Sequence, residues 1–148
     1  MSTDNDIATL WAGVLESSVT IADLCTERFG KAQFVRQGLR EGHELGEKDA
    51  PFLVVLPFSG EDGFEAERSI VKVVITIGIH DHVWEKFGLR GERARGLGSM
   101  ELMEGAVRDI LGETDEPPSR WTGEYENPGP DFFVRHVLYE IDTIRTIG

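Results

Sequence analysis

Cysteine is almost missing from this sequence. Cys25 is the only cysteine among 148 residues, so no disulfide can form within the chain, and a reducing, cytosol-type compartment is expected. Cys25 falls on the apolar stripe of a predicted helix, which favours a small buried side chain over a reactive thiol. The cysteine content therefore argues against a disulfide-linked secreted domain and against a thiol enzyme.

Long hydrophobic runs are missing too. The first ten residues, MSTDNDIATL, have neither a basic segment nor a long apolar one, so they do not match a signal peptide. The apolar runs elsewhere fall far short of the roughly 20 residues that span a bilayer. We expect a soluble protein with no membrane partner.

Positive charge is scarce. Lys and Arg total 15 against 27 Asp and Glu, which gives a formal net charge of -12. Such a surface repels a phosphate backbone, so tight nucleic-acid binding through a broad basic face is not expected. Arg90, Arg93 and Arg95 are nevertheless candidates for a local basic patch. The length and the 40% hydrophobic content predict one globular domain over residues 1–148.

Recognisable catalytic motifs are absent as well. The segment GLRGERARGLG at 88–98 is rich in glycine, but it lacks the Gly-Lys-Ser/Thr ending of a P-loop, and its spacing is not GxGxxG. His43-Glu44 begins like a zinc-protease helix, but Glu47 stands where the second histidine is required. The sequence therefore predicts no catalytic residue and no cofactor.

The clearest pattern present is that of β-strands. Ile70–Ile79 alternates apolar and polar residues with period two, and a second long strand is predicted from Phe133 to Ile147. Phe52–Leu56 is a short apolar run between two prolines and fits a strand buried on both faces. We expect it to pair antiparallel with Ile70–Ile79. Shorter strands are predicted at Gln33–Gln37 and Arg120–Glu126.

Two helices complete the predicted fold. Apolar residues at helical spacing predict one helix from about Asp6 to Arg28, with its weakest part at Ser17–Thr20. A second helix is predicted over Ser99–Leu111, with Ser99 as its N-cap, and Val83–Gly98 before it is expected to be a long loop or a short helix plus loop. The fold class is α+β: a mixed or antiparallel sheet of four to five strands with two helices packed on one face.

Two clusters are weak candidates for metal binding. His80 and His82 lie at i and i+2 at the end of a strand, where both side chains face the same way, Asp81 points away, and His136 on another strand could converge on them. The acidic segment Ser59–Glu67 lacks the spacing of a calcium loop and is expected to be a solvated connection. No metal ligand is therefore assigned.

Contact surfaces are the remaining candidates. Aromatic residues exposed in a glycine-rich loop are typical of a protein interface. The interface candidates are Trp84, Phe87, Leu89, Arg90, Arg93, Arg95, Glu61, Asp62 and Glu65.

The order of elements resembles that of the tail terminator (tail completion) proteins of long-tailed bacteriophages. The resemblance covers the whole chain and rests on pattern: an N-terminal amphipathic helix, the strand between Pro51 and Pro57, the long strand Ile70–Ile79, a polar loop, the short helix SMELMEGAVRDIL, and a final hairpin. It implies a structural subunit without an active site. Such subunits form a ring, usually a hexamer, that caps the tail tube and provides the surface that joins the head.

The resemblance also implies partners and a location. The partners would be further copies of the chain, the tail tube protein and head–tail connector proteins. The protein would belong to the virion tail, and to the host cytoplasm during assembly. Two other readings stay open: a small metal-dependent enzyme around His80, His82 and His136, and a generic protein-binding adaptor module with an apolar groove. The pattern also does not separate a terminator from a related tail-tube or head–tail joining protein.

Overall fold

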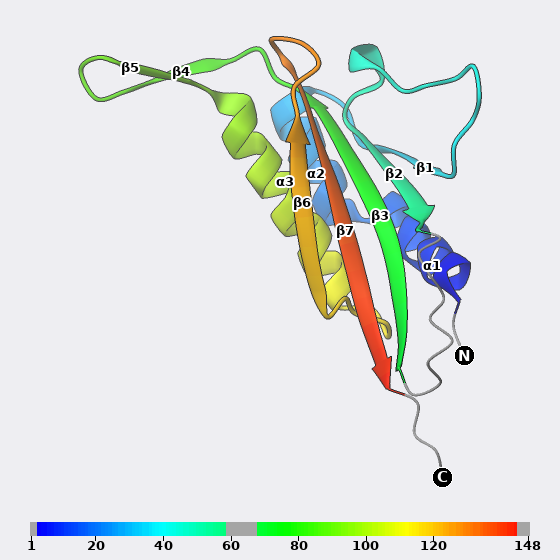
Figure 1. Cartoon of the computed structure of the whole chain (residues 1–148). Coiled ribbons are helices and arrows are strands. Elements are labelled where there is room, and N and C mark those ends of the chain that lie inside the picture. The colour runs from blue at the N-terminus through cyan, green and yellow to red at the C-terminus, as the bar shows by residue number, and fades with distance from the viewer. Residues whose placement is uncertain (1–2, 59–67, 145–148) are drawn as a thin grey trace.

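The computed structural model describes residues 3–58 and 68–144 (Figure 1). Its helices are α1 (Asp4–Ser17), α2 (Val19–Phe29) and α3 (Arg95–Gly112), with a short 3-10 helix, η1, at Glu47–Asp49. The main sheet contains, in spatial order, β1 (Phe34–Gln37), β2 (Phe52–Pro57), β3 (Arg68–His80), β7 (Phe132–Ile144) and β6 (Arg120–Glu126). A separate hairpin pairs β4 (Trp84–Phe87) with β5 (Gly91–Ala94).

The main sheet is mixed. β1 runs parallel to β2, and all other neighbours are antiparallel. The predicted α+β class with a mixed sheet is therefore confirmed, including the antiparallel pairing of the strand after Pro51 with β3. Four consecutive side chains of β2, from Phe52 to Val55, are buried, as expected for a strand covered on both faces.

The longest pairing joins β3 and β7, from Arg68 opposite Ile144 to His80 opposite Phe132. The odd-numbered side chains of β3 from Val71 to Ile79 are buried, so the predicted alternation is confirmed. The strand predicted over Phe133–Ile147 is found as Phe132–Ile144, and its last predicted residues lie outside the described part of the chain.

The single N-terminal helix predicted from the sequence is wrong. Ser18 divides it into α1 and α2, whose axes are bent by 56°. The break falls within the weak segment Ser17–Thr20, where serine and β-branched residues disfavour a continuous helix. The Ser18 side chain accepts a hydrogen bond from the N–H of Ile21 and so caps α2. The described part of the chain therefore contains three α-helices, one more than predicted.

The three α-helices lie on one face of the sheet and bury the main core. Trp11 of α1 meets Tyr139 of β7 edge to face, with ring centres 5.9 Å apart. Cys25 is buried next to Met103, with the two sulfur atoms 3.4 Å apart, so its predicted place in the core is confirmed. We call the opposite face, which carries the even-numbered side chains of β3 and β7, the open face.

The prediction for Val83–Gly98 is also wrong. Residues 84–94 form the β4–β5 hairpin, and α3 begins at Arg95, so Ser99 lies inside the helix and is not its N-cap. Gly96 and Gly98 make this first turn look like a loop, because glycine is a poor helix former. Tertiary packing overrides that preference: a Cβ at Gly96 would lie 2.2 Å from the Phe133 ring, so glycine is needed where α3 meets β7.

Among the described residues, no single helix is long and apolar enough to cross a membrane. Only α1 and α2 taken together, as a pair bent by 56°, have the length and composition of a membrane span.

Candidate assembly surface: a projecting arm and an open groove

The β4–β5 hairpin, residues 84–94, is called the arm. It projects from one end of the sheet, beside the first turn of α3 (Figure 1). Four strand residues at about 3.4 Å each make it about 14 Å long before the turn. Gly88 in the turn has a φ of 63°, a left-handed conformation that favours glycine. A lone two-stranded hairpin is only marginally stable in water, so the arm depends on support at its base.

Large apolar side chains of the arm are exposed. Leu89 is 98% exposed, Trp84 59% and Phe87 49%. The Phe87 ring covers Gly91, and the guanidinium of Arg93 lies 5.3 Å from the centre of the same ring. These interface candidates, together with the exposed Arg90, therefore share one projecting element. Their part in contacts with another molecule stays a prediction.

A buried carboxylate supports the base of the arm. The Asp81 side chain has no exposed surface. Its Oδ1 accepts a hydrogen bond from the N–H of Val83 at 3.1 Å, and its Oδ2 accepts from Nε of Arg95 and from Oγ of Ser99, both at 2.8 Å. The N–H of Arg95 also donates to the carbonyl of Val83. Because Val83 precedes β4 and Arg95 follows β5, this one carboxylate holds both ends of the arm.

The same cluster reaches α2. Nη2 of Arg95 donates to the carbonyl of Arg28 in the last turn of α2, where a cation is favoured by the helix dipole. Nη1 of Arg28 donates in turn to Oγ of Ser99. We call Arg28, Asp81, Arg95 and Ser99 the Asp81 cluster. The cluster joins the base of the arm to α2 and α3 by hydrogen bonds, so the arm is attached to the helices that pack on the sheet.

The electrostatics of the cluster favour an ionised Asp81. Burial by itself raises the pKa of this carboxyl, but the hydrogen bonds from Arg95, Ser99 and the Val83 backbone outweigh that effect, and the net pKa lies below the ordinary 3.8. The Asp81 side chain turns into the body, where it meets Arg95, in line with its expected direction away from His80 and His82. Arg95 likewise belongs to the support of the arm, since its side chain is only 27% exposed.

His80 and His82 lie close to each other but not to His136. The rings of His80 and His82 are 6.3 Å apart, and Nε2 of His80 contacts a carboxylate oxygen of Glu47 at 2.8 Å. His136 is opposite Thr76, four residues from His80 along β3, or about 13 Å away. The described residues contain no group of three or more His, Cys, Asp or Glu side chains that could hold one metal ion.

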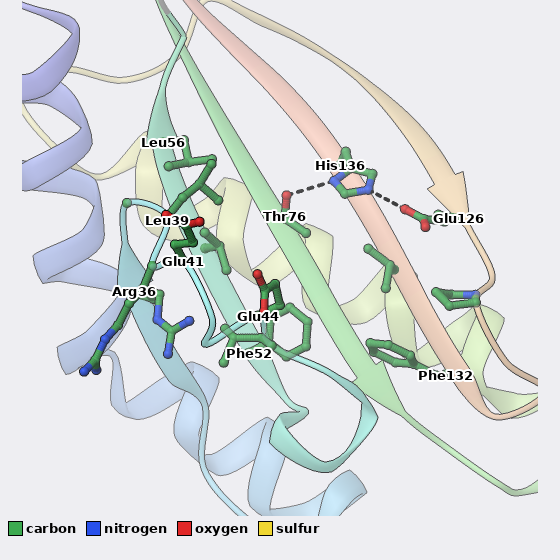
Figure 2. A pocket seen from close by; sticks show the side chains of 16 residues that line it. Arg36, Leu39, Glu41, Glu44, Phe52, Leu56, Thr76, Glu126, Phe132 and His136 are labelled. Carbon is green, nitrogen blue, oxygen red and sulfur yellow. Dashed lines mark hydrogen bonds and ion pairs between the residues drawn. The ribbon is translucent and has the colours of Figure 1, made fainter.

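His136 instead bridges two strands on the open face. Its Nδ1 lies 2.8 Å from Oγ1 of Thr76, and its Nε2 lies 2.9 Å from a carboxylate oxygen of Glu126 (Figure 2). The order hydroxyl–imidazole–carboxylate is that of a hydrolase triad. Thr76, however, lies in a central strand, where the ladder to β2 and β7 engages the backbone amides that an oxyanion would need. We interpret the array as a polar cross-strand bridge.

The open face also carries a groove of about 710 Å³ (Figure 2). Its floor is apolar and comes from β2 and β7, and its wall is the connection between β1 and β2. The apolar lining consists of Leu39, Leu45, Phe52, Val54, Leu56, Pro128, Phe132 and Val134. The His136 bridge lies along one side. Sequence patterning could not reveal this groove, because its parts are up to about 100 residues apart in the chain.

The acidic interface candidates cannot be placed. Glu61, Asp62 and Glu65 lie outside the described residues, as does the rest of the predicted acidic connection between Ser59 and Glu67. Among the described residues, the candidate contact surfaces are therefore the arm, which the Asp81 cluster supports, and the groove.

No protein-family model and no curated protein matches this sequence. The functional argument therefore rests on the geometry of these surfaces.

Proposed function

We propose that this protein is a structural subunit that assembles with copies of itself into a ring, as the tail terminator proteins of long-tailed bacteriophages do. The ring caps the tail tube and presents the surface to which the head joins. The observation that carries the proposal is the arm: a projecting hairpin whose apolar side chains its own chain leaves exposed, held at its base by the buried Asp81 cluster. Exposed apolar residues on a rigid support are typical of a contact element.

The charge of the chain agrees with this role. A ring of subunits that each carry a net charge of -12 would repel a phosphate backbone, so DNA could pass its lumen without binding. The partners are further copies of the chain, the tail tube protein and head–tail connector proteins. The protein acts in the virion tail, after assembly in the host cytoplasm, and needs no active site there.

A protein-binding adaptor module is the second candidate, and the groove on the open face favours it. Grooves of this size with an apolar lining commonly bind a ligand or a peptide segment. The third hypothesis, a metal-dependent enzyme, needed His136 to share one site with His80 and His82. We do not propose it, because His136 lies about 13 Å from His80 along the sheet.

The test combines sedimentation with electron microscopy. The purified chain is examined alone and mixed with tail tubes assembled from the tube protein of the same genome. We expect closed rings, or a cap on one end of each tube, and tubes that stop growing once capped. The variant Phe87→Ser should lose this activity, and Leu102→Ser, at an exposed position of α3, should keep it. A chain that remains a 16.5 kDa monomer and leaves tube growth unchanged overturns the proposal.

A further inference from the structure

The arm and the groove lie on different sides of the molecule. In Figure 1 the arm leaves one side of the sheet end, and the β1–β2 connection that walls the groove lies on the other side. The arm therefore does not cover the groove of its own chain. The two most exposed large apolar side chains among the described residues are Leu89, at 98%, and Leu39, at 84%. Leu89 is in the turn of the arm, and Leu39 lines the groove.

We propose that the arm of one copy docks into the groove of the next copy, with Leu89 buried against Leu39 and the apolar floor. This inference rests on the self-assembly proposed above and specifies which surfaces carry it. One contact then covers both of these exposed leucines.

The dimensions of the two surfaces agree. The groove, at about 710 Å³, lies within the range of about 300–1,000 Å³ over which pockets enclose compact ligands. The tip of the arm, Phe87–Gly91, is narrow because two of its five residues are glycine. The floor residues Phe52, Val54 and Val134 offer aromatic and branched side chains, which suit a leucine or a phenylalanine.

The charges agree as well. The arm carries Lys86, Arg90 and Arg93 against Glu85 and Glu92, a net charge of +1 in a chain of net charge -12. The charged side chains that line the groove are Glu41, Glu44 and Glu126 against Arg36 and Arg40, a net charge of -1 with histidine neutral. No ion pair joins Glu41 or Glu44 to another described residue, and Glu44 accepts one hydrogen bond, from the N–H of Gly42.

Of the arginines that line the groove, Arg36 is already engaged by its own chain. Its guanidinium lies 5.4 Å from the Phe34 ring and donates to the carbonyl of His43. Arg90, next to Leu89, is then placed to meet Glu41 and Glu44 of the wall, where opposite charges also favour encounter of the two copies.

The symmetry that follows is that of a ring. The arm and the groove are different surfaces, so the contact is heterologous: each copy gives its arm to one neighbour and receives the arm of the other. A heterologous contact generates a closed ring if the rotation between copies closes, and an open helix if it does not. Assembly through this contact therefore needs no second interface.

Cysteine cross-linking tests the contact directly. The variants Leu39→Cys and Leu89→Cys are purified separately, mixed in equal amounts and oxidised mildly; native Cys25 is buried and does not interfere. We expect a covalent dimer in this mixture. The control mixture of Leu89→Cys with Val19→Cys should stay monomeric, because Val19 is 70% exposed but lies on α2, away from the groove.

Charge variants test the direction of the contact. Leu89→Asp removes the apolar side chain at the tip of the arm and leaves the groove intact. Leu39→Asp removes an apolar side chain from the groove and leaves the arm intact. Each variant alone should associate about tenfold or more weakly, the factor expected for losing one buried leucine. Mixed together they share one intact arm and one intact groove per pair, so they should form dimers and no rings.

The outcomes separate this inference from the proposed function. Rings that form without the Leu39–Leu89 cross-link, or that survive both aspartate variants, overturn the docking inference and leave the ring in place. A chain that stays monomeric in every condition, with tubes uncapped, overturns both. Cross-linked dimers in the mixture and dimers from the paired aspartate variants support both.

Discussion

Replacing Asp81 by asparagine tests whether the arm depends on a buried ion pair. The change preserves the shape of the side chain but removes its charge and converts one acceptor oxygen into a donor. In either orientation the new amide NH₂ faces a donor, either the N–H of Val83 or the pair formed by Arg95 and Ser99. Arg95 also loses its counter-charge inside the cluster.

The magnitude follows from burial. Breaking a buried ion pair by removing one partner costs about 3–5 kcal/mol, and a hydrogen bond to a charged group contributes about 1.5–3 kcal/mol. The Arg95 side chain is 27% exposed, so water partly solvates its unpaired charge and the low end of the range applies. We expect Asp81→Asn to lower the free energy of unfolding by about 3 kcal/mol. That is a large share of the roughly 5–15 kcal/mol typical of a domain.

Urea unfolding followed by circular dichroism measures this loss. Asp109→Asn is the matched control, since Asp109 is an exposed residue of α3, the helix that begins at Arg95, and surface changes usually stay within about 0.5 kcal/mol. A double-mutant cycle with Arg95→Met should give a coupling of about 1 kcal/mol or more between the two side chains. A loss for Asp81→Asn no larger than that of the control, or a coupling near zero, would refute the reasoning.

The pH dependence has a definite sign. The pKa of Asp81 is lower in the folded chain than its ordinary 3.8, so the folded state binds this proton less readily than the unfolded state does. The stabilisation by Asp81 is therefore fully present above the ordinary pKa and is lost as the pH falls through the folded value. The difference in unfolding free energy between the natural protein and Asp81→Asn should shrink in that acidic window and be constant at neutral pH.

Three further predictions concern the core. Gly96→Ala should lower the free energy of unfolding by about 1–3 kcal/mol, because its Cβ would lie 2.2 Å from the Phe133 ring. Gly98→Ala in the same helical turn has nothing within 4 Å of the new Cβ and should raise the free energy of unfolding by up to about 1 kcal/mol. If urea unfolding shows both variants changing stability in the same direction, the packing argument is contradicted. Tyr139→Phe should be neutral or stabilising in thermal unfolding, because the buried Tyr139 hydroxyl has no hydrogen-bond partner among the described residues, and a clear loss of stability would show that a partner exists. Burial raises the pKa of the Cys25 thiol to about 12, so at pH 8 it should react with a disulfide reagent only as the chain unfolds, and rapid labelling of the folded protein would count against its burial.

The main elements could be predicted because their patterns are local. Alternation in Ile70–Ile79, the proline-bounded apolar run at Phe52 and the helical spacing of the N-terminal segment each reflect burial of one side of one element. Those patterns placed β2, β3 and β7 correctly, and they marked Ser17–Thr20 as the weakest part of the single helix that the structure divides at Ser18. They failed at residues 83–98, which form the arm and the first turn of α3. Two glycines make that turn look like a loop, and the contacts that favour a helix there are tertiary: the close packing of Gly96 on Phe133 and the hydrogen bonds from Arg95 and Ser99 to Asp81.

The candidate site was predicted in part. The sequence alone determined that Trp84, Phe87 and Leu89 lie together in a segment with too little apolar surroundings to bury them, because residues so close in sequence must share one local environment. Tertiary structure alone decided that this segment is a hairpin and that Asp81 supports it through Arg95, fourteen residues away in sequence. It also decided that β2, β7 and the β1–β2 connection enclose a groove. Local patterns record only whether a side chain is buried, whereas the pairing of one buried charge or one strand face with another depends on how the chain closes in space.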